Sequence, residues 1–99
     1  MSPEEQAELL VRARGLSRKR DYPGAIAVYR QLIATDPDSV SGYEGLAMVG
    51  FVGGDYETAI AAFVRLIQLQ PTEPRHYVNL GAVYNRIGEH HKAAEVLRK

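Results

Sequence analysis

Apolar residues recur at helical spacing from the start of this chain. Leu9, Ala13 and Leu16 follow the i, i+4, i+7 pattern of one helix face. The opening Ser-Pro-Glu-Glu has the spacing of a capping box, with the proline in the first turn, where an amide has no helical partner. This pattern predicts a first helix over residues 3–19.

Apolar helical stretches and turn residues continue to alternate along the rest of the chain. Asp21 can cap a second helix, Pro23 fits its first turn, and Pro37 follows its end. Later stretches repeat this order. We predict an all-α fold without strands, in which three antiparallel pairs of helices cover residues 3–19, 22–35, 39–52, 56–69, 73–86 and 90–98.

A repeat of 34 residues underlies this pattern. Tyr22 returns as Tyr56, and Tyr43 returns as Tyr77. Of the 65 residue pairs separated by 34 positions, 15 are identical, whereas unrelated residues of ordinary composition would give about four. The chain therefore contains three copies of a helix-turn-helix unit, which bury their apolar faces by stacking on one another.

The residues at fixed places in each copy resemble the tetratricopeptide repeat. The third copy fits this family best, with Tyr77-x2-Leu80-Gly81-x2-Tyr84 followed by Gly88, Ala93 and Leu97. The first copy departs from the pattern, because Arg12 and Arg20 replace the usual leucine and turn glycine. The resemblance covers nearly the whole chain. It implies one domain over residues 1–99, a right-handed superhelical stack (α-solenoid) with repeats at about 6–39, 40–73 and a truncated 74–99.

One helix of the second copy carries an apolar stripe that its own repeat does not need. Met48, Phe51 and Val52 fall opposite the side that meets the partner helix when successive residues rotate by about 100°. Family members use such positions to line a concave groove for an extended peptide or a helix. The implied groove has an apolar floor between basic ends, and its candidate residues are Leu10, Arg14, Arg18, Glu44, Met48, Phe51, Val52, Arg75, Val78, Asn85 and Arg86. The same stripe would arise if these side chains packed against neighbouring repeats.

Some family members hold a C-terminal carboxylate with a clamp of lysine, arginine and asparagine side chains. Arg75 matches one basic position of that clamp. Leu10, Arg14, Gly45 and Asn79 occupy positions where the clamp requires other residue types. The resemblance therefore does not imply a receptor for a chaperone tail.

Composition and charge narrow the class of partner. Twelve basic and twelve acidic residues cancel, so no net field favours nucleic acid or an anionic membrane. Basic residues predominate in 1–20 and 74–99, and acidic residues in 21–73. The chain has no cysteine, and it shows neither a signal peptide nor an apolar run of about eighteen residues. We therefore predict a cytoplasmic protein without disulfides or thiolate metal sites.

The sequence holds no pattern typical of catalysis or metal binding. His90 and His91 are adjacent, so on a helix they point about 100° apart. No nucleophile, phosphate-binding loop or carboxylate pair accompanies them. We predict that the protein is not an enzyme and that it uses no cofactor or metal.

The first helix of the second copy is rich in glycine. Gly42, Gly45, Gly50 and Gly53 lie within it or at its end, and each internal glycine costs roughly 1 kcal/mol relative to alanine. Two interpretations are open. The glycines either make this helix mobile or allow close packing against neighbouring helices.

The sequence stops inside the last predicted helix, which leaves apolar surface uncovered. We expect either that the chain is the N-terminal part of a longer protein or that copies pair weakly through this end.

The pattern as a whole predicts a protein–protein interaction module with a scaffold or adaptor role. Its partner would be a peptide segment or helix of another protein that carries acidic and apolar side chains. Self-assembly through exposed repeat ends, including a homodimer through the C-terminal helix, is the alternative. A more distant alternative is nucleic-acid contact by the basic cluster over residues 12–20, which would weaken steeply with salt.

Overall fold

The computed structural model describes residues 1–98, which form six α-helices and no strand. Their bounds are α1 Pro3–Arg18, α2 Tyr22–Thr35, α3 Val40–Val52, α4 Tyr56–Leu69, α5 Pro74–Arg86 and α6 His90–Leu97. All six predicted helices are confirmed, with ends that differ by at most one residue. The third predicted repeat extends to residue 99, which lies outside the described residues. Over residues 1–98, no helix is both long enough and apolar enough for a membrane span.

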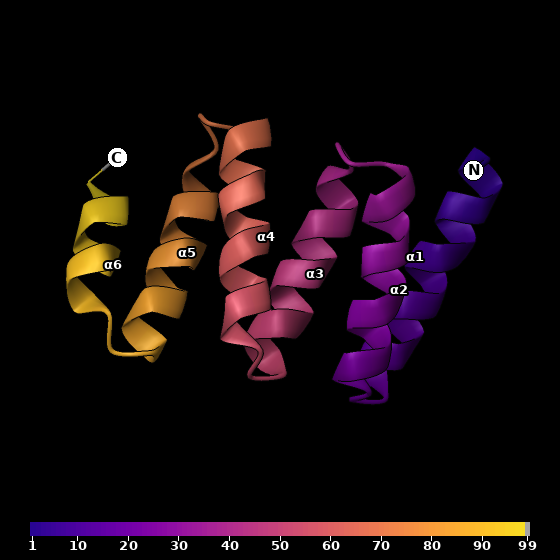
Figure 1. Cartoon of the computed structure of the whole chain (residues 1–99), viewed down its shortest axis with the longest axis horizontal. Coiled ribbons are helices and arrows are strands. Elements are labelled where there is room, and N and C mark those ends of the chain that lie inside the picture. The colour runs from indigo at the N-terminus through magenta and orange to yellow at the C-terminus, as the bar shows by residue number, and fades with distance from the viewer. Residues whose placement is uncertain (99) are drawn as a thin grey trace.

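The helices form a row in which each packs against the next along the chain (Figure 1). The pairs α1–α2, α3–α4 and α5–α6 are the three repeats, and contacts of α2 with α3 and of α4 with α5 join them. Helix α1 also contacts α3, so the first helices of these two repeats lie on the same side. The stack measures 41 × 27 × 16 Å. It is the α-solenoid that the repeat predicts.

The turns inside the three repeats share one residue of positive φ, and the first two also share an aspartate cap. Asp21 and Asp55 cap α2 and α4 by accepting a hydrogen bond from the amide three residues on. The residue before the cap has a positive φ in every repeat, 63° at Arg20, 81° at Gly54 and 82° at Gly88. Only glycine adopts this conformation without steric cost. The first repeat therefore forms the common turn at an energetic disadvantage.

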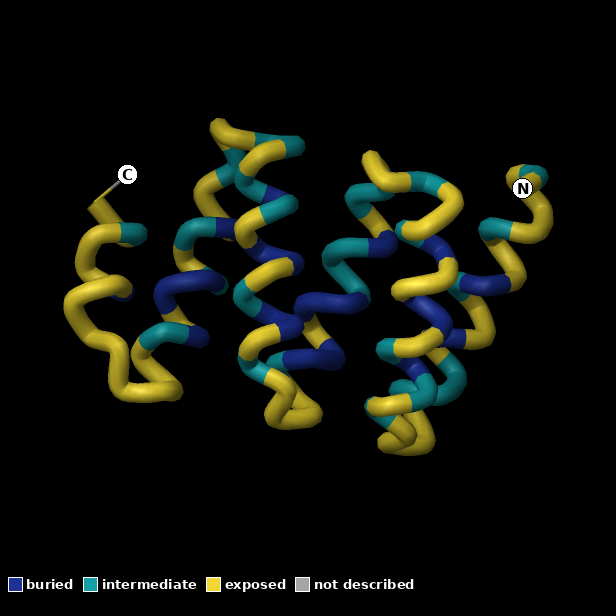
Figure 2. The backbone as a smooth tube through the Cα atoms, in the orientation of Figure 1, coloured by how far each residue is buried: buried dark blue, intermediate teal, exposed yellow. Residues whose placement is uncertain are grey.

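Small and large residues alternate in the core at equivalent places of the repeats. Ala25 and Ala59 are completely buried, and the neighbouring Tyr29 and Phe63 are 4% and 3% exposed. Leu97 occupies the third equivalent position and is 52% exposed. The buried segments run through the middle of the stack, and the outer turns of both terminal helices are exposed (Figure 2).

The glycines of α3 lie where neighbouring helices approach closely. A Cβ added at Gly42 would lie 2.8 Å from Ile33 Cγ2, and one at Gly50 would lie 3.0 Å from the amide nitrogen of Ala59. Both distances are shorter than ordinary carbon contacts of about 3.5–4.0 Å. Of the two interpretations of these glycines, the structure supports close packing.

Candidate protein-interaction groove

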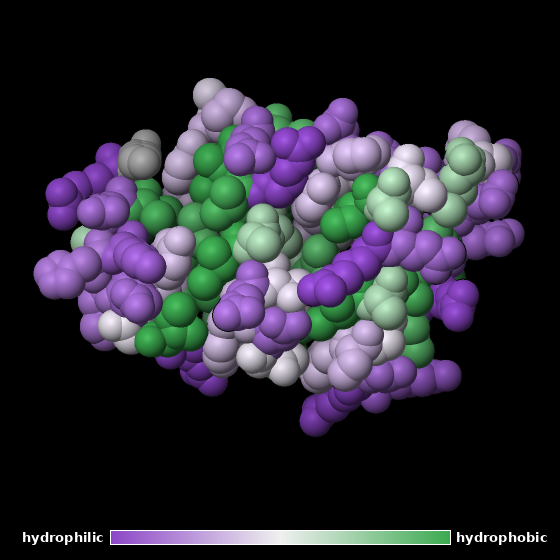
Figure 3. Space-filling view, in the orientation of Figure 1, coloured by the Kyte–Doolittle hydropathy of each residue, from purple (hydrophilic) through white to green (hydrophobic). Residues whose placement is uncertain are grey.

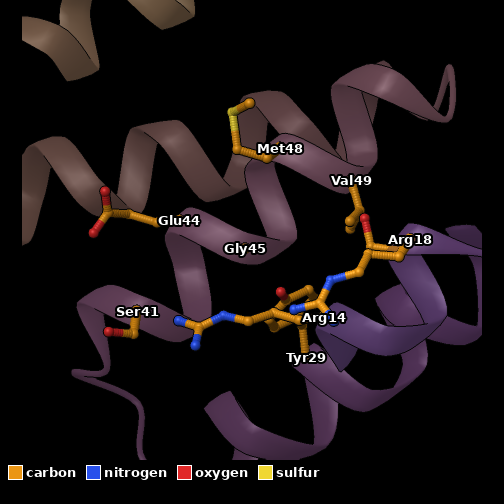
Figure 4. Close-up of a pocket in the computed structure, with 9 residues that line it drawn as sticks. Arg14, Arg18, Tyr29, Ser41, Glu44, Gly45, Met48 and Val49 are labelled. Atoms are coloured by element: carbon orange, nitrogen blue, oxygen red, sulfur yellow. The ribbon is translucent and has the colours of Figure 1, made fainter. Parts of the chain in front are cut away.

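Two adjoining pockets lie along α1, α3 and α5. The polar pocket has a volume of about 510 Å³ and opens between α1 and α3 (Figure 4); it is lined by Arg14, Ser17, Arg18, Tyr29, Ser41, Glu44, Gly45, Met48 and Val49. The apolar pocket has a volume of about 110 Å³; it is lined by Met48, Phe51, Phe63, Asn79 and Ala82. Met48 lines both pockets, so we treat the two together as one groove.

Arg14 and Arg18 give the polar pocket its positive charge. Both are exposed residues of α1, and their side chains reach into the space beside α3 (Figure 4). Their i, i+4 spacing places them on the same face of the helix. Tyr29 enters the pocket from α2. Burial raises the pKa of its hydroxyl above the ordinary 10.0, an effect that the neighbouring Arg14 guanidinium opposes. The hydroxyl is therefore protonated at neutral pH and available as a donor.

An ion pair separates the polar pocket from the third repeat. Glu44 Oε2 on α3 lies 3.0 Å from Arg75 Nη2 on α5, and Arg75 Nε lies 3.9 Å from Glu73 Oε1. Arg86 Nε donates to the Tyr56 hydroxyl at 3.4 Å. Of the two basic ends that the sequence predicts for the groove, the one at the third repeat is thus partly neutralised, and the one at the first repeat is retained.

The apolar pocket repeats the construction of the polar pocket one repeat later. Phe63 lines it from α4, as Tyr29 lines the polar pocket from α2. Asn79 takes the place that Gly45 has in the polar pocket. Because a cavity of about 150 Å³ holds benzene, a volume of about 110 Å³ suits one aliphatic side chain.

The apolar residues of α3 divide into two kinds. Met48 and Val52 are 52% and 58% exposed, so they provide accessible apolar surface. Phe51 is half-buried against the core and meets the Tyr56 ring edge to face, with 6.0 Å between ring centroids. Phe51 therefore belongs to the core as well as to the groove, as the packing interpretation of this stripe expects.

The other predicted groove residues do not line either pocket. Leu10 is partly buried against the core. Val78 is 57% exposed and lines a separate hollow beside Pro71. Asn85 Oδ1 lies 2.9 Å from His90 Nδ1. The structure thus brings together, in the two pockets, the predicted residues Arg14, Arg18, Glu44, Met48 and Phe51.

The sequence prediction missed the aromatic residues that line the two pockets. Tyr29 and Phe63 are buried core residues, and their rings also face the groove. The 34-residue register contained the signal. It places both rings at one repeat position and places Gly45 and Asn79 at another. The ring position of one repeat therefore faces the Gly45 or Asn79 position of the next, and a pocket lies at each of these contacts.

A buried histidine lies between the second and third repeats. His76 is 1% exposed, and its Nε2 lies 2.7 Å from Gln70 Oε1. Burial, and to a lesser degree the Arg75 charge, lowers the pKa of His76, whereas Glu44 and Glu73 oppose the shift. Among residues 1–98, no group of three histidine, cysteine, aspartate or glutamate side chains is placed to hold a metal ion.

Comparison with known sequences identifies the family. The sequence profile of the tetratricopeptide repeat family matches residues 10–74 and 53–99. A stretch of 75 residues, 76% of this chain, is 31% identical to cellulose synthase operon protein C of Pseudomonas fluorescens (strain SBW25). The chain spans only 6% of the length of that relative.

Solved structures share the fold over almost the whole chain. The CopN-Scc3 complex gives a TM-score of 0.92 at 20% identity, over 99% of this chain and 58% of that chain. MamA gives 0.83 at 28% identity, over 96% and 56%. The Yersinia enterocolitica type III secretion translocator chaperone SycD gives 0.85 at 21% identity, over 96% and 72%. The chain belongs to the tetratricopeptide repeat family, whose members are generally non-catalytic protein-interaction modules.

Proposed function

We propose that this tetratricopeptide repeat domain binds a segment of another protein in the groove formed by the polar and apolar pockets, and that it acts as a cytoplasmic scaffold or adaptor rather than as an enzyme. The observation that carries the proposal is the exposure of Met48. Its side chain is 52% exposed between two pockets instead of packing into the core. An accessible apolar side chain between concave surfaces is typical of a peptide-binding groove.

The binding mode follows from the kinds of side chain along the groove. An extended or helical segment would lie across α1, α3 and α5. Its apolar side chains would contact Met48, Phe51, Val52 and Val78, and its acidic groups would lie near the arginines of α1. Apolar contact would supply most of the affinity, and charge would set the orientation and the rate of association.

The similar proteins support this proposal at the level of class. One solved structure is a complex of two named proteins, and another is a translocator chaperone. Those names describe the other proteins, and the identities of 20% and 21% carry only the fold to this chain. A protein as the partner of this chain is part of the proposal and is in keeping with these examples of the same fold.

Selection from a random library of displayed 12-residue peptides tests this proposal. Enriched peptides would be synthesised and titrated into ¹⁵N-labelled protein. The proposal expects the largest changes in amide shift on α1, α3 and α5 beside the groove. Changes concentrated on α2, α4 and α6 would contradict it.

Self-assembly is a second candidate, which two exposed side chains support. Tyr29 and Phe63 each face the first helix of the next repeat, and Leu97 has the equivalent position but is 52% exposed. Val11, at the position of Gly45 and Asn79, is 68% exposed. Packing of Leu97 of one copy on Val11 of another would continue the stack.

Sedimentation analysis of the parent and of Leu97→Lys tests this second candidate. Self-association that Leu97→Lys abolishes would support it. A monomer at concentrations of about 1 mM would exclude it. A further repeat in a longer chain would cover the same surface, which is the domain arrangement that the sequence predicts.

A further inference from the structure

We propose that the polar pocket binds the carboxylate of an aspartate or glutamate side chain in the partner segment, and that this contact fixes the direction in which the segment lies. The inference rests on the proposed function of the groove. It adds the chemistry of one subsite and the position of that subsite relative to the apolar pocket.

Neither arginine of the polar pocket forms an ion pair with an acidic side chain of the part of the chain that the structure describes. Among residues 1–98, the ion pairs of arginine with aspartate or glutamate involve Arg65 and Arg75. Arg14 and Arg18 take part in none of them. Two guanidinium groups four residues apart on one helix face repel each other, and a bound anion would relieve this repulsion.

The pocket also supplies neutral donors beside this charge. Ser17, Ser41 and Tyr29, which carry hydroxyl groups, line the same pocket as the two arginines; Figure 4 shows Tyr29 and Ser41 beside Arg14. A carboxylate accepts up to four hydrogen bonds, and arginine can donate two of them in parallel. The lining residues thus carry more than enough donors for one carboxylate.

The single acidic residue of the pocket does not cancel this charge. Glu44 lines the same pocket as the arginines, but its Oε2 is paired with Arg75 at 3.0 Å. The site also differs from the carboxylate clamp that the sequence lacks. Arg14 and Gly45 stand at clamp positions with other residue types, and Arg18 is not one of the clamp positions. Arg75, which matches the clamp, is engaged by Glu44.

The shared wall at Met48 sets the spacing between the two bound side chains. Packed helices lie about 8–10 Å apart, so neighbouring gaps between successive first helices are separated by a similar distance. An extended chain covers that distance in about three residues at roughly 3.3 Å each. The partner segment should therefore carry an acidic residue about three positions from an aliphatic residue, with the acidic residue over α1.

The test uses peptides enriched from the displayed 12-residue library. Each acidic residue is replaced in turn by its amide, aspartate by asparagine and glutamate by glutamine, and affinity is measured by fluorescence anisotropy. One such replacement should weaken binding about five- to twentyfold. The Arg14→Gln/Arg18→Gln double variant should bind the acidic peptide more weakly by a similar factor. Its affinity for the amide peptide should be nearly that of the parent protein.

A second double variant controls for the loss of net charge. Arg12→Gln/Lys19→Gln removes two charges from exposed positions, one in α1 and one at its C-cap, that lie outside both pockets. It should alter affinity less than twofold at 150 mM salt. The proposal of a carboxylate site is wrong if this control lowers the affinity for the acidic peptide as much as the Arg14→Gln/Arg18→Gln variant does. It is also wrong if the acidic and amide peptides bind with equal affinity.

Failure of the groove itself has a separate signature. If Met48→Lys abolishes binding of peptides that contain no essential acid, the groove binds segments and only the carboxylate site is refuted. If the affinity of enriched peptides is unchanged by Met48→Lys, or if no peptide is enriched, both proposals fail.

Discussion

The Tyr29 ring lies directly over the backbone of Gly45. A Cβ built on Gly45 would come within 2.2 Å of the ring carbons Cε1 and Cζ and within 2.7 Å of the hydroxyl oxygen. The contact joins α2 of the first repeat to α3 of the second, at the back of the polar pocket. Packing of the two repeats and the shape of the groove therefore depend on the same pair of residues.

Gly45→Ala should destabilise the fold. Alanine is a better helix former by about 1 kcal/mol, but its methyl group would displace the Tyr29 ring, and overpacking of this kind costs about 1–3 kcal/mol. We expect a net loss of about 0–2 kcal/mol in the free energy of unfolding, measured by urea denaturation.

Gly15→Ala is the matched control for Gly45→Ala. Gly15 lies within α1, and no atom approaches within 4 Å of a Cβ added there. The same substitution should therefore stabilise the protein by about 0.5–1 kcal/mol. If both variants change the free energy of unfolding in the same direction by the same amount, Tyr29 does not pack closely on Gly45.

Arg20→Gly should stabilise the first turn. Arg20 has a φ of 63°, a conformation that costs an L-residue about 1–2 kcal/mol. Part of the gain is lost because glycine is more flexible in the unfolded chain, by about 0.4–1 kcal/mol. A net gain of up to about 1 kcal/mol in thermal or urea unfolding is expected. Gly88→Ala, at a φ of 82°, should lower stability, and a gain there would contradict the assignment of this turn.

His76 should make the contact between the second and third repeats sensitive to acid. Its pKa in the folded protein is lowered, mainly by burial, so the unfolded chain takes up the proton first as the pH falls. The contribution of His76 to stability is therefore complete above pH 6.5 and is lost below it, by at most about 1.4 kcal/mol per pH unit for one proton. Melting temperatures between pH 7.5 and 5 measure the loss.

The His76→Leu variant isolates this effect from the titration of surface carboxylates. It should lose less stability than the parent over the same pH range. His91→Gln, at an exposed position of α6, should follow the parent. A His76→Leu variant with the full acid sensitivity of the parent would refute the role of His76.

Substitutions along α3 should separate its structural residues from its binding residues. Phe51→Ala removes a ring that packs on Tyr56 and on the core, so we expect it to lower stability by about 1–3 kcal/mol. Val52→Ala removes a side chain that is 58% exposed and should change stability by less than about 0.5 kcal/mol. Equal effects in thermal melts would show that these two positions do not differ in packing.

The fold was predictable from the sequence because helix, cap, turn and core residues recur at a spacing of 34 residues in the three copies. The buried alanines recur in all three repeats, the capping aspartates in the first two, and the turn glycines in the last two. The groove was only partly predictable. Helical spacing places Arg14, Arg18 and Met48 on one side, but the ion pair of Glu44 with Arg75 depends on how far α3 lies from α5. No one-dimensional pattern contains that distance.

Charge reversal of an apolar position inside and outside the groove tests the account most directly. Met48 lies between the two pockets, whereas Val64 is an exposed apolar residue of α4 that lines neither. Other apolar side chains are visible around α4 on the face shown in Figure 3. Affinity of Met48→Lys and Val64→Lys for an enriched peptide is the measurement. The account predicts at least a tenfold loss for Met48→Lys and less than a twofold change for Val64→Lys, with both variants folded. Unchanged binding by Met48→Lys together with loss in Val64→Lys would contradict it.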